Sequence, residues 1–219
     1  MNSAVASLEP GSEESESAVT GHGAGGPAPK RIVVGYGFWI FLISDVVMFS
    51  TLFASYAVLF KETAGGPSAR ELFDLRNTAA ETALLLASTF TCAMASLAVA
   101  HRNMKWTQLS LLVTGLLGAA FLTLEWREFA GLVARGAGPT RSAFLSSFFT
   151  LVGCHGAHVT AGILWLGTMM AQFPAKGFRR DICHRFLCFS LFWHALDIIW
   201  VAIFSLVYLV GTLPSELLP

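Results

Sequence analysis

The stretch FWHALDIIW, Phe192 to Trp200, places a histidine and an aspartate inside an otherwise apolar run. The surrounding run covers residues 190–211, which as a helix is long enough to cross about 30 Å of hydrocarbon. An ionisable group at the centre of a membrane helix costs about 2.5–3.5 kcal/mol on insertion scales. His194 and Asp197 therefore need either a partner inside the protein or a chemical task.

The composition is that of a membrane protein. Of the 219 residues, 54% are hydrophobic and 13% are charged, and the mean hydropathy is +0.62. A soluble domain carries about 25% charged residues. The formal net charge is zero and no basic patch with interleaved aromatic residues is present, which argues against a nucleic-acid partner.

Five apolar spans are predicted, at about 35–60, 78–100, 107–133, 142–172 and 185–211. Lipid offers no hydrogen bonds to open backbone groups, so each span should be a helix. We predict an all-α fold, a polytopic bundle of five transmembrane helices within a domain of residues 31–213. Residues 1–30 are rich in Ser, Gly, Pro, Ala and Glu and lack an apolar run, so we predict a disordered cytoplasmic tail.

The positively charged residues favour one orientation of these spans. The side of the membrane that carries the amino terminus holds eight Lys and Arg residues, and the other side holds six. The excess predicts a cytoplasmic amino terminus and an outer carboxyl terminus. The four cysteines form no CxxC pair, and we interpret all of them as structural.

Ionisable residues lie well inside four of the five spans. They are Asp45 in the first span, Glu125 and Glu128 in the third, His155 and His158 in the fourth, and His194 and Asp197 in the fifth. At 100° per residue, His194 and Asp197 share an arc of their helix, as do His155, His158 and Gly162, and likewise Gly118 and Glu125. Such faces turn toward other helices rather than lipid. Glu81, near the start of the second span, is expected at the membrane interface.

The chemistry of these faces is open from the residues alone. The i, i+3 spacings ExxE, HxxH and HxxD resemble the inward-facing ligands of di-metal bundles. The helix rise, however, places the carboxylates of the third span a turn or two away from the histidines. Hydrogen-bonded structural pairing is therefore favoured over metal or haem ligation and over proton or ion conduction. Trp193 and Trp200 flank the polar pair, and we interpret them as packing residues or interfacial anchors.

Three motifs together point to a family. They are ISDVV in the first span, HGAHV in the fourth and WHALDIIW in the fifth. With them, the chain from about Gly35 to Gly211 resembles subunit III of the haem–copper respiratory oxidases. The resemblance is closest to the bo-type ubiquinol oxidases, which have five helices in this subunit. The sequences AGGP after the first span and FLSSFFTLVGCHGAHVTAG favour the same group.

The resemblance implies a non-catalytic subunit of a complex that oxidises ubiquinol, reduces oxygen to water and pumps protons. It implies no cofactor and no catalytic or metal-binding residue in this chain, with haem and copper in subunit I. The implied partners are subunit I directly, subunits II and IV, and membrane phospholipids. The implied location is a bacterial inner membrane, with a cytoplasmic amino terminus and a periplasmic carboxyl terminus.

The same resemblance implies roles for the polar residues. Glu125, Glu128, His155, His158, Trp193, His194, Asp197 and Trp200 match the family pattern and are expected to serve structure or assembly. The alternative is a stand-alone membrane transporter or haem-binding membrane protein that uses the same polar faces.

Overall fold

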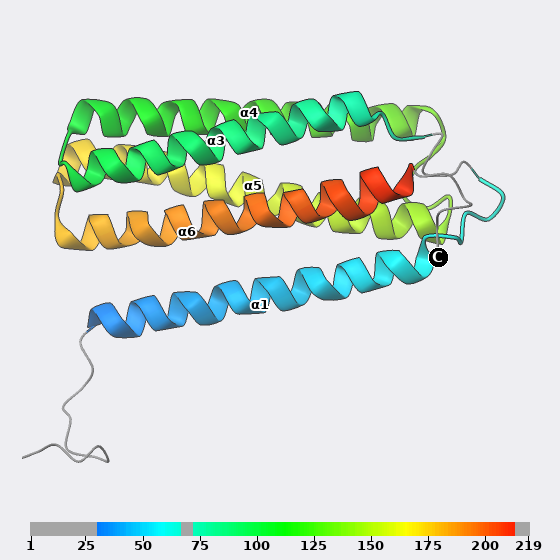
Figure 1. Ribbon diagram of the computed structural model, residues 1–219, viewed down its shortest axis with the longest axis horizontal. Helices are drawn as coiled ribbons and strands as arrows, with labels where there is room; N and C mark the ends of the chain where they lie inside the picture. Colours follow the sequence, from blue (N-terminus) through cyan, green and yellow to red (C-terminus); the bar gives the residue numbers. More distant parts are fainter. Residues whose placement is uncertain (1–29, 67–71, 213–219) are drawn as a thin grey trace, which may run out of the picture.

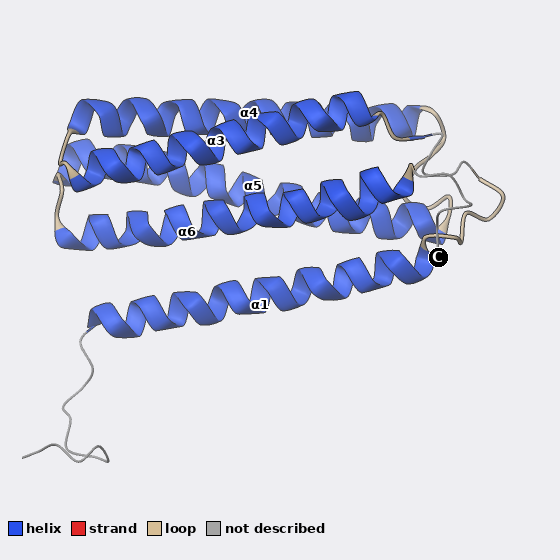
Figure 2. Cartoon of the chain, in the orientation of Figure 1, coloured by secondary structure: helices blue, strands red, loops and turns tan. Residues whose placement is uncertain are grey.

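The computed structural model describes residues 30–66 and 72–212, so the predicted tail lies almost entirely outside the described residues. The helices are α1 (Lys30–Leu59), α3 (Leu75–Ala100), α4 (Met104–Ala134), α5 (Ala143–Lys176) and α6 (Arg180–Ile203), and α6 continues into a π-helix, η1 (Phe204–Leu209) (Figure 1). Five segments are long and apolar enough to cross a membrane, and the described residues contain no strand (Figure 2). The prediction of an all-helical, five-span fold is confirmed.

Side-chain caps fix where three of the helices begin. Asp74 accepts a hydrogen bond of 3.0 Å from the Arg76 backbone N–H at the start of α3. Asn103 and Ser142 cap α4 and α5 in the same way. Such caps satisfy backbone donors that have no partner within the helix. Because α3 begins at Leu75, Glu81 lies nearly two turns inside the helix and is 1% exposed. The side chain of Glu81 therefore faces the interior of the bundle.

Helices α3 to α6 form a bundle, and α1 flanks it. The three-residue connection 101–103 holds α3 and α4 together as an antiparallel pair. Helix α1 contacts α5 and α6, and it leaves most of its surface uncovered (Figure 1). In its most apolar window only 11% of the residues are buried, compared with 50% in the corresponding window of the span formed by α6 and η1. The functional residues of the bundle interior therefore come mainly from α3 to α6.

Aromatic rings fill the interior of the bundle. The largest fully buried side chains include Trp200, Tyr208, Phe49, Phe121, Phe144, Phe148, Phe173 and Phe189. The π-helical turn η1 carries Tyr208 into this core, where its ring lies 4.8 Å from that of Phe73 and 5.9 Å from that of Phe148. A π-turn inserts an extra residue into the helical repeat, which changes the face that the following side chains present.

Candidate functional site

Trp193 connects all four helices of the bundle. Its indole N–H donates a hydrogen bond of 3.1 Å to Oγ of Ser88 on α3. The ring lies against Gly118 of α4 and Gly162 of α5, where an added Cβ would come within 2.9 Å of the indole. The two glycines thus form the slot that admits the ring. The sequence placed Gly118 and Gly162 on inward faces but did not show that they face one tryptophan.

Trp200 repeats this arrangement two turns further along α6. Its indole N–H donates a hydrogen bond of 3.1 Å to Oγ1 of Thr82 on α3. Its ring makes an edge contact with Phe121 of α4 at 4.6 Å and lies 5.1 Å from the ring of His155 on α5. Because α3 and α6 are antiparallel, the pairs Trp193–Ser88 and Trp200–Thr82 fix both the register and the rotation of the two helices.

His155 is fully buried among these aromatic rings. Neither ring nitrogen has a hydrogen-bond partner among the described residues. A cavity of about 10 Å³ lies next to it, lined also by Trp193 and Asp197. That volume corresponds to about one water-sized probe. The imidazole is thus enclosed by aromatic side chains, and the space beside it is too small for a cofactor.

His194 and Asp197 are not a closed pair. They lie one turn apart on α6 and interact electrostatically, yet no ion pair within 4 Å joins them in the described part of the chain. Asp197 is 8% exposed, and its carboxyl faces Thr89 of α3. The hydrogen bonds that tie α6 to α3 come instead from the two neighbouring tryptophans and from Ser190, whose Oγ lies 3.3 Å from that of Ser96.

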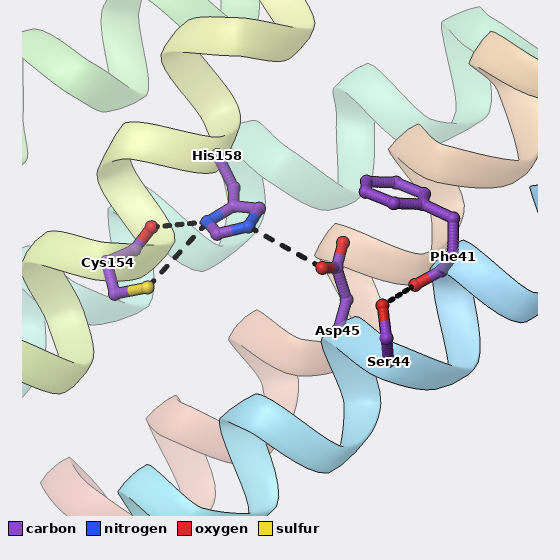
Figure 3. A network of polar contacts seen from close by, with 5 residues as sticks. All are labelled: Phe41, Ser44, Asp45, Cys154 and His158. Carbon is purple, nitrogen blue, oxygen red and sulfur yellow. Dashed lines mark hydrogen bonds and ion pairs between the residues drawn. The ribbon is translucent and has the colours of Figure 1, made fainter.

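Asp45 of α1 finds its partner on α5. Its Oδ1 lies 3.9 Å from Nε2 of His158 (Figure 3). Nδ1 of the same ring donates a hydrogen bond of 2.7 Å to the Cys154 carbonyl, which fixes the orientation of the imidazole. The ring edge of Phe49 also meets His158 at 5.3 Å. This contact is the polar link between α1 and the bundle, and hydropathy alone did not identify it.

Three carboxyl groups gather where α3, α4 and η1 meet. Glu81, Glu125 and Glu128 are close enough to interact electrostatically, and the hydroxyl of Tyr208 faces Glu128. Both oxygens of Glu125 and both of Glu128 are buried without a hydrogen-bond partner among the described residues. The sequence predicted Glu125 and Glu128 as inward-facing. Glu81 joins them because α3 starts early, and Tyr208 joins them because of the π-turn.

The polar residues are therefore spread over several contacts rather than gathered into one centre. Within residues 30–66 and 72–212, no three His, Cys, Asp or Glu side chains converge as metal ligands would. All four cysteines are free thiols. Trp193, Trp200 and the Asp45–His158 contact each join different helices, which is what polar residues do when they specify packing in a membrane.

Comparison with known proteins decides the family. The family model for cytochrome c oxidase subunit III matches residues 15–212. The chain belongs to this family. It is 51% identical over 179 residues to cytochrome bo(3) ubiquinol oxidase subunit 3 of Pseudomonas aeruginosa, which covers 81% of this chain and 85% of the relative.

Two further relatives show the range of the family. The chain is 46% identical to cytochrome bo(3) ubiquinol oxidase subunit 3 of Pseudomonas putida, over 81% of this chain and 86% of the relative. It is 45% identical to cytochrome c oxidase subunit 3 of Bacillus sp. strain PS3, over 80% and 84%. Relatives named for ubiquinol and relatives named for cytochrome c are thus similar to this chain to nearly the same degree.

Proposed function

We propose that the chain is the non-catalytic subunit III of a bacterial ubiquinol oxidase, a complex that reduces oxygen to water and pumps protons. The observation that carries the proposal is the 51% identity to a ubiquinol oxidase subunit 3 over most of both chains. In this role the chain binds beside subunit I, which holds the haem and copper, and ubiquinol is the substrate of the whole complex. Subunits II and IV and membrane phospholipids complete its surroundings.

The interior of the bundle supports a role in assembly. Trp193, Trp200 and Phe121 fill the space between α3, α4, α5 and α6, and the cavity beside His155 holds about one water. Buried polar residues without a reacting partner serve to fix which helices pack together. We therefore assign structural roles to Asp45, Glu125, Glu128, His155, His158, Trp193, His194, Asp197 and Trp200.

The location follows from the same assignment. The relatives named above are bacterial, and the five spans fit an inner-membrane protein. The eight-to-six distribution of Lys and Arg supports a cytoplasmic amino terminus and a periplasmic carboxyl terminus.

Affinity purification of the tagged chain in mild detergent tests the proposal. We expect a larger haem-containing protein to copurify in fixed ratio, and we expect the purified complex to consume oxygen with ubiquinol as donor. Reduced cytochrome c, tested in parallel, should not support turnover. A chain that elutes alone, without a haem spectrum, would refute the assignment to an oxidase.

A further inference from the structure

One end of the bundle carries a basic surface. The connection 101–103 between α3 and α4 and the connection 177–179 between α5 and α6 lie at the same end as the start of α1 (Figure 1). A hydrogen bond of 3.0 Å from the Gln108 side chain to the Met170 carbonyl holds α4 against α5 near these connections. Six exposed cations, which we call the basic end, surround them: Arg102, Lys105, Lys176, Arg179, Arg180 and Arg185.

The basic end has little counter-charge within the described chain. Asp181 is the one carboxylate in residues 101–106 and 172–186, and it pairs with Arg179 at 3.5 Å. No ion pair among the described residues involves the other five cations. Arg102 also has a φ of 51°, a left-handed conformation that suits glycine better than arginine. The chain thus places a charge where its backbone favours a residue without a side chain.

The segment before α1 has the opposite charge. Residues 1–29, which lie outside the described residues, contain four glutamates and no lysine or arginine. The glutamates are Glu9, Glu13, Glu14 and Glu16. The tendency of cations to gather on the cytoplasmic side of a membrane accounts for the basic end. It does not account for an acidic segment attached at the same end of the bundle.

The acidic segment is attached close enough to reach the basic end. Thirteen residues, four of them glycine, separate Glu16 from Lys30, where α1 begins. A glycine-rich chain of this length has a root-mean-square span of about 20 Å and spans at most about 50 Å when extended. Neighbouring helix axes are about 8–10 Å apart, and α1 contacts both α5 and α6. The connection 177–179 therefore lies within reach of the glutamates.

We propose that residues 9–16 dock on the basic end and tie the start of α1 to the bundle. Carboxylates pair with guanidinium and ammonium groups through charge-assisted hydrogen bonds, and such pairing requires no regular structure in the acidic segment. The start of α1 has little other support. None of residues 32–38 is buried, whereas Leu42 and Phe49 further along the helix are.

A segment of this chain is a better occupant of the basic end than a separate anion. Attachment through a short linker gives the glutamates an effective concentration in the millimolar range at the cations. An acidic partner protein or an anionic headgroup must bind from outside and lacks this advantage. The inference concerns a contact within one chain, so it goes beyond the proposed function and does not depend on it.

The test couples carboxylates to amines in the purified complex, in mild detergent at low salt. A water-soluble carbodiimide joins a carboxylate to a lysine amine where the two groups touch, and mass spectrometry identifies the joined peptides. We expect links from residues 13–16 to Lys105 or Lys176 of the same chain. The screening length falls from about 10 Å at 0.1 M salt to about 3 Å at 1 M, so these links should be lost at the higher concentration. Lys61, beyond the opposite end of α1, should form no such link.

Charge variants test whether the contact supports α1. Replacing the three glutamates of residues 13–16 by glutamine should let the backbone amides of residues 32–38 exchange faster with deuterium. Aspartate at the same three positions keeps the charge and should preserve wild-type exchange. Arg179→Gln combined with Arg180→Gln should act like the glutamine variant. Arg135→Gln removes an exposed arginine at the opposite end of the bundle and is the matched control, with exchange unchanged.

Three results would overturn the proposal. The first is the absence of links between residues 13–16 and the two lysines, which would leave the basic end to anionic headgroups. The second is linkage of the glutamates to another protein of the complex, which would assign the segment to a partner subunit. The third is unchanged exchange of residues 32–38 in the glutamine variant. All these measurements are made on this chain, so they remain readable if no haem-containing partner copurifies.

Discussion

The indole N–H of Trp193 reaches Ser88 across 3.1 Å, from α6 to α3, while the ring fills a slot between glycines of α4 and α5. One side chain thus sets the spacing of four helices. A glycine allows this approach because it has no Cβ, and the hydrogen bond occupies the polar edge of the ring in a region without water. We expect the bundle to be more sensitive at this contact than at any of its charged residues.

Replacing Gly162 by alanine should destabilise the bundle. The new Cβ would lie 2.9 Å from the Trp193 ring, which is rigid and has no open space on its other side, where Gly118 lies. Overpacking of this kind costs about 1–3 kcal/mol. We expect a lower thermal midpoint and less subunit III in the purified complex.

Gly167→Ala is the control for this substitution. It lies on the same helix, and nothing approaches its new Cβ within 4 Å. Alanine is favoured over glycine in a helix by about 0.5–1 kcal/mol, so this variant should equal or exceed the wild type in stability. Equal stability of Gly162→Ala and Gly167→Ala would show that the slot is not tightly filled.

A double-mutant cycle should detect the hydrogen bond between Trp193 and Ser88. Ser88→Ala leaves the indole N–H buried without an acceptor, at about 1–3 kcal/mol. Trp193→Phe removes the donor and also creates a cavity. Because the two residues share one contact, the double variant should be less destabilised than the sum of the single variants. Additive losses in thermal midpoint would exclude the bond.

The sequence predicted the five helices because hydropathy can be read locally along the chain. A run of about 20 apolar residues, as a helix, is long enough to cross the membrane. The sequence also placed Gly118 and Gly162 on inward faces, because those faces follow from the helical repeat, and it interpreted Trp193 and Trp200 as packing residues or interfacial anchors. The sequence could not show which residues on the neighbouring helices these side chains contact. Which residue of α3 meets which residue of α6 depends on the relative translation of the two helices, and that is fixed only when all contacts form together.

Two differences have local causes. Glu81 lies nearly two turns inside α3, where it is buried, because Asp74 starts this helix earlier than hydropathy indicates. Tyr208 faces the carboxyl groups because η1 changes the helical repeat after Ile203, and the apolar sequence there carries no signal for a π-turn. The cluster of carboxyl side chains near α4 therefore contains Glu125 and Glu128, which the sequence pattern predicted as inward-facing. It also contains Glu81 and Tyr208, which the pattern did not assign to that face.

Removing Asp197 should harm assembly more than removing His194. Asp197 is 8% exposed and its carboxyl faces Thr89, whereas His194 is only half-buried. Asp197→Leu leaves the Thr89 hydroxyl facing an apolar side chain, while Asp197→Asn keeps a polar group of the same shape. We expect subunit III retention to fall in the order Asp197→Asn, His194→Leu, Asp197→Leu. Full retention in Asp197→Leu with oxygen reduction lowered more than tenfold would contradict a structural role.

The two ends of the chain should report opposite compartments. Five helices cross the membrane, and the start of α1 and the end of η1 lie at opposite ends of the structure (Figure 1). A cytoplasm-active reporter should therefore work at the amino terminus, and a periplasm-active reporter should work at the carboxyl terminus. A cytoplasmic signal from both fusions would mean that one of the five helices does not cross.

Breaking the contact between Asp45 and His158 should loosen α1 without unfolding the bundle. Asp45 Oδ1 and His158 Nε2 are 3.9 Å apart, and α1 has few other buried groups to hold it (Figure 3). Asp45→Leu leaves the imidazole facing hydrocarbon, so backbone amides of α1 should exchange faster with deuterium while those of α3 to α6 keep their protection. Ser44→Ala is the matched control, because Ser44 Oγ donates its hydrogen bond to the Phe41 carbonyl of its own helix. Faster exchange in Ser44→Ala to the same degree would attribute the change to the helix itself, and unchanged exchange in Asp45→Leu would show that apolar packing alone holds α1 against α5.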